Sequence, residues 1–262
     1  SVATAHIIKV TSLNANTKYY YTIGTTTSTL QGNTDNFFVT SPTSSSKRKI
    51  TAAVFGDCGR NDNNYQSNTL TRYQSYLQNN GMQAADLMLL LGDNAYPNGT
   101  DAEYTTGFFA PYQNSILKNH ILFPAPGNHE YANNGSRQDD HNIDYYKIFT
   151  VPDGGQSGGV PSNNPAYYAF DWGNIHFLSL DSYGEEDAGT TRLYDTTGAQ
   201  VQWIKTDLAA NTKKWTIAYW HHPPYTMGSH NSDTENDLVA FREKFIQILE
   251  RNGVDLILCG HS

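Results

Sequence analysis

The sequence is organised around the stretch Leu87-Met88-Leu89-Leu90-Leu91-Gly92-Asp93-Asn94-Ala95-Tyr96. Its first five residues are all apolar, which is typical of a strand that is buried on both faces of a parallel sheet. Asp93 comes just after this strand, and the phenol of Tyr96 follows three residues later. Open α/β sheets usually bind ligands outside the carboxyl ends of their strands. The stretch therefore predicts a ligand site at Asp93, although an aspartate in this position also fits a simple turn.

The same pattern, an apolar run followed by side chains of the kinds that bind metals, recurs four more times. The four instances are Ile50–Phe55 before Gly56-Asp57-Cys58-Gly59, Ile121–Ala125 before Pro126-Gly127-Asn128-His129-Glu130, Trp215–Trp220 before His221-His222, and Val254–Cys259 before Gly260-His261. The five strand ends supply carboxylate, phenol, amide and imidazole groups, and they need no thiolate. Such a donor set suits hard or borderline ions such as iron, manganese or zinc. The number of donors leads us to expect two such ions.

The order of these motifs resembles that of a known family. The sequence has Gly-Asp-x-Gly, Gly-Asp-x-x-Tyr, Gly-Asn-His-Glu, a strand that ends in histidine and a terminal Gly-His. Over residues 50–262 it resembles the purple acid phosphatases, a branch of the calcineurin-like metallophosphoesterases. Many relatives carry histidine two residues after the first aspartate, where this sequence has Gly59. The resemblance implies that Tyr96 replaces the lost ligand, as a phenolate on ferric iron, and that the fold is a four-layer α/β/β/α sandwich.

The resemblance also implies which residues bind the two metals. Fe(III) would be held by Asp57, Asp93 and Tyr96. Asp93 would bridge to a divalent ion, which would be Zn, Mn or Fe. The other ligands of the divalent ion would be Asn128, His221 and His261.

Two further histidines are expected to face the substrate. His129 follows Asn128 directly, and His230 stands nine residues after His221, where the family places a histidine that binds phosphate or protonates the leaving group. Imidazole suits both tasks because its pKa lies near the working pH. Asn231 stands where some relatives carry a second active-site histidine.

The other polar residues of the motifs are expected to have supporting roles. Glu130 would orient a ligand, and His222 would bond to the backbone or support the ligands rather than bind a metal. The histidines outside the motifs are expected to be structural or on the surface; they are His6, His120, His141 and His176. Cys58 and Cys259 are expected to be separate buried thiols, although a disulfide stays possible if the two strand ends adjoin.

The composition argues against several classes of function. Lys and Arg number 17 and Asp and Glu number 25, which gives a net charge of −8. No basic stretch indicates nucleic-acid binding, and Lys47-Arg48-Lys49 is interpreted as a solvated linker. We expect small phosphorylated substrates, with the necessary positive charge supplied by the metals. No apolar run has the length of a membrane span.

The composition also favours a secreted protein, because charged residues are few and Asn, Ser, Thr and Tyr are abundant. Asn98-Gly99-Thr100 and Asn134-Gly135-Ser136 are acceptor sequences for N-glycosylation in a eukaryotic secretory route. The sequence does not predict the oligomeric state or the natural substrate.

The N-terminal part is predicted to be a separate unit. Lys18–Gly24 and Asn36–Thr40 are rich in aromatic and β-branched residues, which predicts strands. The sequence around Tyr19 resembles the tyrosine corner of fibronectin type III-like sandwiches. We therefore interpret residues 1–44 as the C-terminal part of such a domain, and residues 45–49 as a polar linker.

Residues 50–262 are predicted to form the catalytic domain, in which strands and helices alternate as in α/β folds. Amphipathic periodicity predicts helices near residues 66–80, 102–117, 142–149, 198–210 and 236–252. A β-hairpin is predicted between Tyr167–Phe170 and Ile175–Leu180. The domain is expected to be incomplete at its C-terminus, because the family motif is Gly-His-x-His and the sequence stops at Ser262, one residue after His261.

These features predict an acid phosphatase, a phosphoric monoester hydrolase in which a metal-activated hydroxide attacks phosphorus. The nearest alternative is a phosphodiesterase or nucleotide pyrophosphatase of the same superfamily, because relatives share these ligands. The alternative from another class is a non-catalytic surface or binding protein that retains the fold. Metal content and the rates on mono- and diesters would separate the three.

Overall fold

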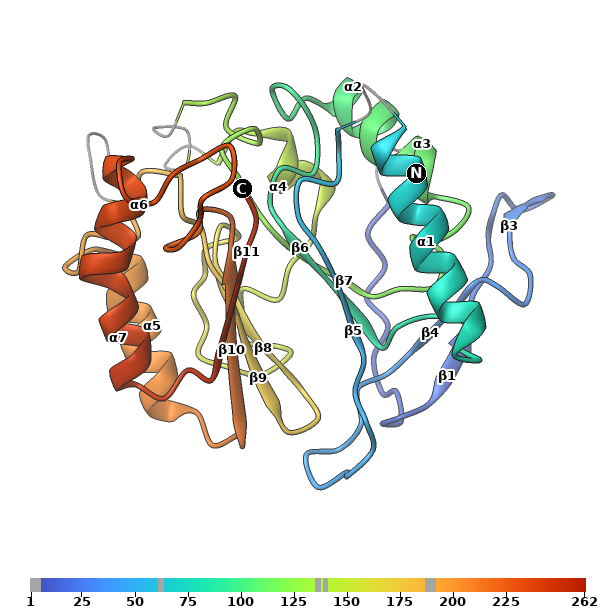
Figure 1. The fold of residues 1–262 in the computed structure, drawn as a ribbon. Helices are drawn as coiled ribbons and strands as arrows, with labels where there is room; N and C mark the ends of the chain where they lie inside the picture. The colour runs from blue at the N-terminus through green and yellow to red at the C-terminus, as the bar shows by residue number, and fades with distance from the viewer. Residues whose placement is uncertain (1–5, 61–63, 135–137, 139–140, 187–191) are drawn as a thin grey trace.

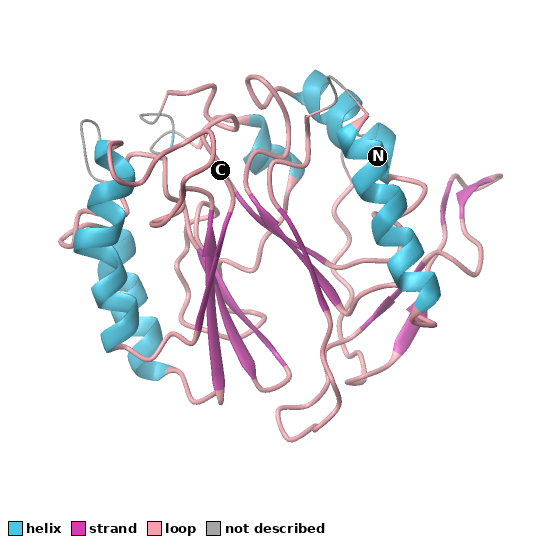
Figure 2. Ribbon diagram, in the orientation of Figure 1, coloured by secondary structure: helices cyan, strands magenta, loops and turns pink. Residues whose placement is uncertain are grey.

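Two β-sheets face each other in the centre of the computed structural model, and helices cover their outer faces (Figures 1 and 2). The structure describes residues 6–60, 64–134, 138, 141–186 and 192–262. The first sheet has the order β5-β6-β7, and its parallel strands are β5 (Ala52–Phe55), β6 (Leu87–Leu91) and β7 (Leu122–Ala125). The second has the order β11-β10-β9-β8, and its strands are β8 (Tyr168–Trp172), β9 (Ile175–Ser179), β10 (Trp215–Trp220) and β11 (Leu256–Cys259). Strands β9, β10 and β11 are parallel, and β8 forms the predicted hairpin with β9.

Helices pack on the outer side of each sheet (Figure 1). The first sheet is flanked by α1 (Tyr65–Asn79) and by a continuous helical segment composed of α2 (Asp101–Glu103), η1 (Tyr104–Phe109) and α3 (Ala110–Tyr112). The second is flanked by α5 (Ala199–Ala210) and by α6 (Asn236–Ala240), η3 (Phe241–Phe245) and α7 (Ile246–Arg251). A short helix, α4 (Asp144–Ile148), lies between β7 and β8 in the chain. This order of layers confirms the predicted α/β/β/α sandwich.

Strand β6 is buried on both faces, as its apolar sequence predicts. Alternate residues of a strand face opposite sides. The residues that face the second sheet are Leu87, Leu89 and Leu91. Met88 and Leu90 instead face the helices around Phe108. Phe123 of β7 stacks on Phe170 of β8 with ring centroids 3.6 Å apart, so aromatic packing joins the two sheets.

The helical segment 101–112 differs from its prediction. The sequence predicts a helix as far as residue 117, whereas residues 113–119 form turns and Tyr104–Phe109 form the π-helix η1. This π-helix brings Gly107 onto the loop after β5, where a Cβ atom on Gly107 would lie 2.4 Å from the carbonyl oxygen of Gly59. Only glycine fits such a close approach. Packing on Gly59, rather than helix propensity, therefore accounts for the geometry of this segment.

The N-terminal residues form short strands, as predicted. The pairs are β1 (Lys18–Tyr20) with β4 (Phe37–Val39) and β2 (Ile23–Gly24) with β3 (Thr29–Gln31). The Tyr21 hydroxyl donates to the Lys118 carbonyl at 2.8 Å and ties this part to the catalytic part. The backbone N–H of Asn14 donates to the Tyr19 hydroxyl at 2.8 Å. The fibronectin type III-like assignment and the domain boundaries stay predictions.

Three other expectations concern the whole chain. Cys58 and Cys259 are separate thiols, as predicted; Cys58 is buried, whereas Cys259 is only partly buried. In the part of the chain that the structure describes, no helix combines the length and the apolar character needed to cross a membrane. Asn98 of the first N-glycosylation acceptor is exposed, whereas Gly135 and Ser136 of the second lie outside the described residues.

Candidate metal centre

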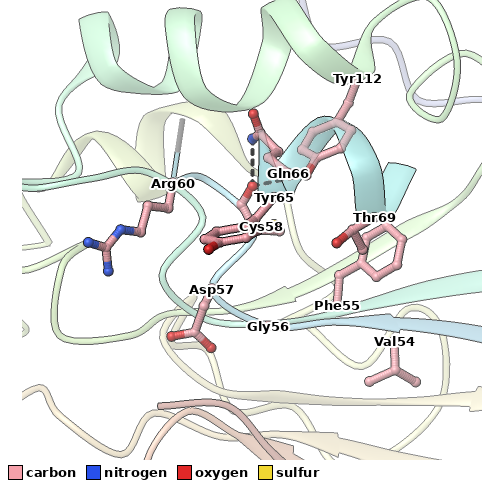
Figure 3. A pocket seen from close by; sticks show the side chains of 10 residues that line it. All are labelled: Val54, Phe55, Gly56, Asp57, Cys58, Arg60, Tyr65, Gln66, Thr69 and Tyr112. Atoms are coloured by element: carbon pink, nitrogen blue, oxygen red, sulfur yellow. Dashed lines mark hydrogen bonds between the residues drawn. The ribbon is translucent and has the colours of Figure 1, made fainter. Parts of the chain in front are cut away.

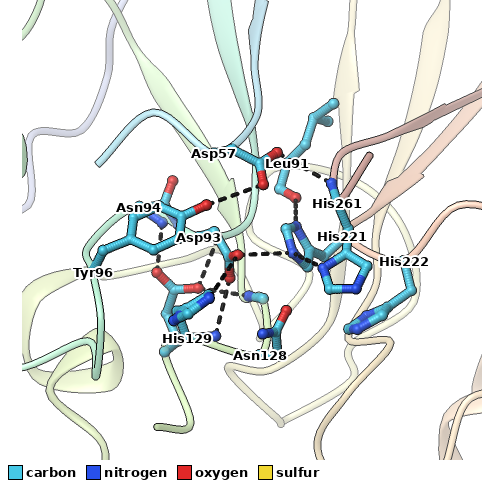
Figure 4. Close-up of polar contacts among 12 residues, drawn as sticks. Asp57, Leu91, Asp93, Asn94, Tyr96, Asn128, His129, His221, His222 and His261 are labelled. Atoms are coloured by element: carbon cyan, nitrogen blue, oxygen red, sulfur yellow. Dashed lines mark hydrogen bonds and ion pairs between the residues drawn. The ribbon is translucent and has the colours of Figure 1, made fainter. Parts of the chain in front are cut away.

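The polar residues that follow five strands meet at one edge of the two sheets (Figure 4). Within each sheet these strands are parallel, so their carboxyl ends lie on the same side. The residues that follow β5, β6, β7, β10 and β11 are, in this order, Asp57, Asp93, Asn128, His221 and His261. Motifs from both sheets thus contribute to a single cluster.

Asp93, His221 and His261 form the centre of this cluster. The Nε2 atom of His221 lies 3.0 Å from Oδ2 of Asp93 and 3.0 Å from Nδ1 of His261. One ligand atom from each of the three residues lies within 4.8 Å of the other two. Asp93 and His221 are buried, and His261 is partly buried. Donor atoms at these separations are spaced as the ligands of one cation.

The backbone decides which nitrogen of His221 faces the cluster. Its Nδ1 atom lies 2.8 Å from the carbonyl oxygen of Leu91, which only accepts, so Nδ1 carries the proton and donates. Histidine ligands of metals commonly make this bond, because it leaves Nε2 directed at the ion. Burial disfavours a charge on His221, but the carboxylate of Asp93 outweighs burial and raises the pKa of His221 to about 9. Asp93 and His221 therefore face each other across a position that suits a positive charge.

Asn128 provides an independent indication of a cation. Its amide nitrogen donates to Oδ1 of Asn133 at 2.8 Å, which fixes the orientation of the side chain. Its Oδ1 atom is buried and has no hydrogen-bond partner among the described residues. An unpaired buried oxygen is costly, by about 1–3 kcal/mol. A metal ion bound by this oxygen would remove that cost, so the residues present fit a metal.

Asp57 and Tyr96 lie beside this centre and contact each other. The Tyr96 hydroxyl donates to Oδ1 of Asp57 at 3.0 Å, and the His261 backbone N–H donates to Oδ2 of Asp57 at 3.1 Å. Burial raises the pKa of Tyr96, and the charges of Asp93 and Asp57 raise it further. The phenol therefore keeps its proton until a strongly charged cation displaces it, which suits a hard trivalent ion.

Three of these residues have a left-handed backbone. The φ angle is 55° at each of Asp57, Asp93 and His261. This conformation costs a non-glycine residue roughly 1–2 kcal/mol. Such strain persists where the surrounding structure enforces it, and it is common at functional sites. Neighbouring glycines leave the necessary room, since a Cβ atom on Gly127 would lie 2.3 Å from Oδ1 of Asp93.

Glu130 holds the backbone from which the central aspartate extends. Its carboxylate is buried and accepts the N–H groups of Asp93 at 2.9 Å, Asn94 at 2.7 Å and Gly127 at 2.7 Å. The Tyr104 hydroxyl also donates to it, at 3.0 Å. Burial raises the pKa of Glu130 to about 7, and the charge of Asp93 contributes in the same direction. With all these donors around it, Glu130 is placed to orient Asp93 rather than to bind a metal.

The two histidines expected to face the substrate lie at the margin of the cluster. The Nε2 atom of His129 is 3.8 Å from Oδ2 of Asp93. The ring of His230 stacks on the ring of His261, with centroids 3.8 Å apart. The Nδ1 atom of His230 also lies 2.9 Å from the Oε2 atom of Glu235. The structure thus brings both histidines to the predicted metal ligands.

A sequence profile of the calcineurin-like phosphoesterases matches residues 50–262, which is most of the chain. The chain belongs to the calcineurin-like phosphoesterase family. Its curated relatives include purple acid phosphatases of Arabidopsis thaliana. Purple acid phosphatase 15 is 27% identical over 98% of this chain and 48% of its own length. Purple acid phosphatase 21 is 25% identical over 98% of this chain and 51% of its own length. The chain therefore spans about half the length of the curated relatives it matches.

Two solved structures share the fold of this chain. Purple acid phosphatase PPD1 from yellow lupin seeds has a TM-score of 0.62 at 19% identity, over 86% of this chain and 40% of its own. GAP50, described as the anchor in the inner membrane complex of Plasmodium, has a TM-score of 0.52 at 14% identity, over 81% of this chain and 66% of its own. At these identities the likeness supports the fold alone.

The sequence predicts that His222 bonds to the backbone or supports the ligands. The first alternative is wrong for the ring, because its Nδ1 atom is hydrogen-bonded to the Ser182 hydroxyl at 2.8 Å and the ring stacks on Tyr183. The ring also lies beside the ring of His261, with centroids 4.2 Å apart, which fits the second alternative. Burial lowers the pKa of His222 well below its usual value, which keeps the ring neutral and able to accept. The sequence contained a signal for the role of Ser182. The predicted strand Ile175–Leu180 is followed by Asp181-Ser182, in the same pattern as the five ligand motifs.

The remaining histidines lie outside this cluster, as predicted. His6 and His141 are exposed. His120 is buried, and its Nε2 atom is hydrogen-bonded to the Tyr73 hydroxyl at 2.6 Å. His176 is buried between two aspartates.

Proposed function

We propose that this protein is a dinuclear-metal phosphoric monoester hydrolase of the purple acid phosphatase type. The observation that carries the proposal is the approach of Asp93, His221 and His261 to within 4.8 Å of one another, beside the unpaired oxygen of Asn128. The purple acid phosphatases among its relatives support the same activity. The substrates would be small phosphorylated molecules, and the composition together with the exposed Asn98 acceptor supports a secreted protein.

The donor set favours two different metals. Asp57, Asp93 and Tyr96 offer three anionic oxygens once the phenol is ionised, which suits Fe(III). The mixed oxygen and imidazole set would hold Zn, Mn or Fe as a divalent ion, and its members are Asp93, Asn128, His221 and His261. When bound, such a pair of cations binds phosphate oxygens and lowers the pKa of the water that attacks phosphorus.

The chain's own residues would orient the substrate and move protons. The Nδ1 atom of His129 is bonded to the Pro97 carbonyl oxygen at 2.6 Å, so its Nε2 atom faces the site. The Nδ1 atom of His230 is bonded to Glu235 in the same manner, which leaves its Nε2 atom for the substrate. We assign phosphate binding to His129 and protonation of the leaving oxygen to His230.

The likeness to GAP50 keeps a second candidate open, a non-catalytic binding protein that retains the fold. Fold alone does not decide between catalysis and binding, because one fold hosts many functions. The donor set favours the hydrolase, because a protein that only binds a partner has no need of converging carboxylate, amide and imidazole ligands.

The test combines metal analysis, turnover and colour. We expect two metal ions per chain, and faster hydrolysis of p-nitrophenyl phosphate than of bis-p-nitrophenyl phosphate. We also expect a visible charge-transfer band that Tyr96→Phe removes and that Tyr76→Phe, a change on an exposed helix, leaves intact. A faster rate on the diester would favour the phosphodiesterase. A chain without bound metal and without turnover of either ester would favour the binding protein.

A further inference from the structure

The carbonyl group of Cys58, one residue after the predicted ligand Asp57, is held by two side chains (Figure 3). It accepts from Nε2 of Gln66 at 2.7 Å and from the Tyr112 hydroxyl at 2.9 Å. These bonds use both lone pairs of a buried oxygen. Gln66 also donates to the Gly107 carbonyl at 2.6 Å, so the amide joins the loop after β5 to the π-helix η1. Together with Asp57, Gln66 and Tyr112 line a pocket of about 520 Å³.

The opposite side of the same loop is held by the backbone of the central motif. The Asp57 N–H donates to the Gly92 carbonyl at 3.1 Å, and the Gly59 N–H donates to the Asp93 carbonyl at 3.3 Å. Cys58 stands between Asp57 and Gly59 in the chain, and its carbonyl instead accepts from Gln66 and Tyr112. The loop is therefore fixed from both sides, and Gln66 and Tyr112 provide the outer side.

This fixation acts on a strained residue. Asp57 has a φ angle of 55°, a conformation that persists only where its surroundings enforce it. The loop also has no room to adjust, because a Cβ atom on Gly59 would lie 2.0 Å from the Asn94 carbonyl oxygen. The loop thus packs closely against Asn94 on one side and is hydrogen-bonded to Gln66 and Tyr112 on the other. These contacts hold the Asp57 carboxylate in one position, beside Tyr96.

We propose that Gln66 and Tyr112 form a clamp on the Cys58 carbonyl that positions Asp57 for metal binding. This inference rests on the proposed function, because the metal that the clamp would affect is the one that Asp57 and Tyr96 are proposed to bind. Neither residue belongs to the five ligand motifs, and among the described residues their side chains donate to the carbonyls of Cys58 and Gly107 rather than to a proposed ligand side chain. They are positioning residues, which act through the backbone of Cys58.

The principal test replaces Gln66 by leucine, which keeps the size of the side chain and removes its donor. In metal-free protein, hydrogen exchange of the backbone amides 56–60 should become about fivefold faster or more, as loss of one hydrogen bond implies. Titration with Fe(III), followed by the Tyr96 charge-transfer band, should show an affinity about 10–100-fold lower. Zn²⁺ binding at Asn128 and His221 should not change, because the clamp does not contact those residues.

The control is Gln74→Leu, the same substitution at an exposed position on the same helix. If Gln66→Leu does not fold, Tyr112→Phe is the second variant. It removes only the phenol oxygen, and with it the other hydrogen bond to the Cys58 carbonyl, and the same results are expected. Exchange and Fe(III) affinity equal to those of the control would overturn the clamp. Absence of a band in the unaltered protein would instead contradict the proposed iron site, and the exchange rates would still decide whether the clamp holds the loop.

Discussion

At the scale of single residues, Asp93 has the central place in the candidate site. It contacts His221, and its Oδ1 atom accepts the His129 backbone N–H at 3.0 Å. Burial opposes its ionisation, but the neighbouring His221 outweighs burial and holds the pKa of Asp93 below its usual value. Asp93 is therefore a carboxylate at neutral pH, buried and oriented by Glu130. In the proposed dinuclear site, this buried carboxylate would bridge the two cations, whose charge would compensate its burial.

We predict that Asp93→Asn abolishes hydrolysis and dinuclear metal binding together. Asparagine keeps the shape of the side chain and tolerates the left-handed backbone, but it lacks the charge that two cations share. Metal content per chain and turnover of a phosphate ester check this expectation. Asp101→Asn, at an exposed aspartate, is the control. Two metals bound with unaltered affinity in Asp93→Asn would rule out the bridging role.

We also predict that His230→Ala lowers turnover by about 100-fold or more while metal content stays the same. The reason is that His230 stacks on His261, a proposed ligand, while Glu235 is bonded to Nδ1 of His230, so that Nε2 would serve the substrate in the proposed assignment. Glu235→Gln should give a smaller loss, because it keeps the imidazole and removes only its charged partner. If His230→Ala loses a metal ion, the histidine is a ligand and the assignment of the leaving-group acid is wrong.

At the scale of elements, a buried ion cluster fastens the hairpin β8–β9 to helix α5. His176 of β9 is 2.9 Å from Asp171 of β8 and 2.6 Å from Asp207 of α5. Lys213 lies 3.1 Å from Asp171, and the Val160 N–H donates to Asp207 at 2.6 Å. The cluster lies near the start of β9, whereas the metal centre lies where the strands end. It therefore bears on the stability of the second sheet rather than on catalysis.

This cluster predicts a loss of stability at alkaline pH. Burial disfavours a charged His176, but its hydrogen bonds to Asp171 and Asp207 outweigh burial and raise the pKa from 6.5 to about 9. A group with a raised pKa in the folded state stabilises fully below its unfolded pKa, and this stabilisation is lost as pH rises through the folded pKa. The free energy of unfolding should therefore decline between about pH 6.5 and pH 9.

Urea unfolding of metal-free protein at several pH values measures this decline. In His176→Gln the decline over the same window should be shallower but not absent, because His176 is gone while His221, whose pKa is also raised to about 9, still titrates in metal-free protein. His141→Gln, at an exposed histidine, should behave as the unaltered protein does. Parallel pH dependence in all three proteins would show that His176 does not carry the effect.

At the scale of the whole molecule, the metal centre joins two sheets that also share an apolar core. The first sheet contributes Asp57, Asp93 and Asn128, and the second contributes His221 and His261. Away from this edge, aromatic side chains such as Phe123 and Phe170 fill the space between the sheets. Packing therefore holds the sheets together without metal, and bound metal adds a connection at one edge.

We predict that removal of metal lowers the midpoint of thermal unfolding but leaves a cooperative transition. An ion that binds only the folded state stabilises it by about 4 kcal/mol when its free concentration is 1,000 times its dissociation constant. Calorimetry with and without a chelator measures the shift. Asp93→Asn should show a much smaller shift, because it loses the shared ligand. A chelator that leaves the midpoint of the unaltered protein unchanged would contradict a metal centre that spans the sheets.

The sequence by itself determined the strands and their polar ends. An apolar run such as Leu87–Leu91 can be recognised in the sequence, because a strand that is buried on both faces needs consecutive apolar residues. The polar residues that follow such a strand are then given by the order of the chain. The alternation of strands and helices, the hairpin at Gly173 and the helix ends at Gly81 and Gly253 are likewise local, since each depends on a few neighbouring residues. The class of the site followed from the donor types at the strand ends.

Only the tertiary structure decided how those donors are arranged, because the deciding contacts join residues far apart in the chain. The nitrogen of His221 that faces Asp93 is set by the carbonyl of Leu91, 130 residues earlier. The unpaired oxygen of Asn128 and the hold of Gln66 on Cys58 likewise depend on how loops from different strands meet. Local propensity contains no information on such long-range contacts, since packing of the two sheets and their helices brings the loops together.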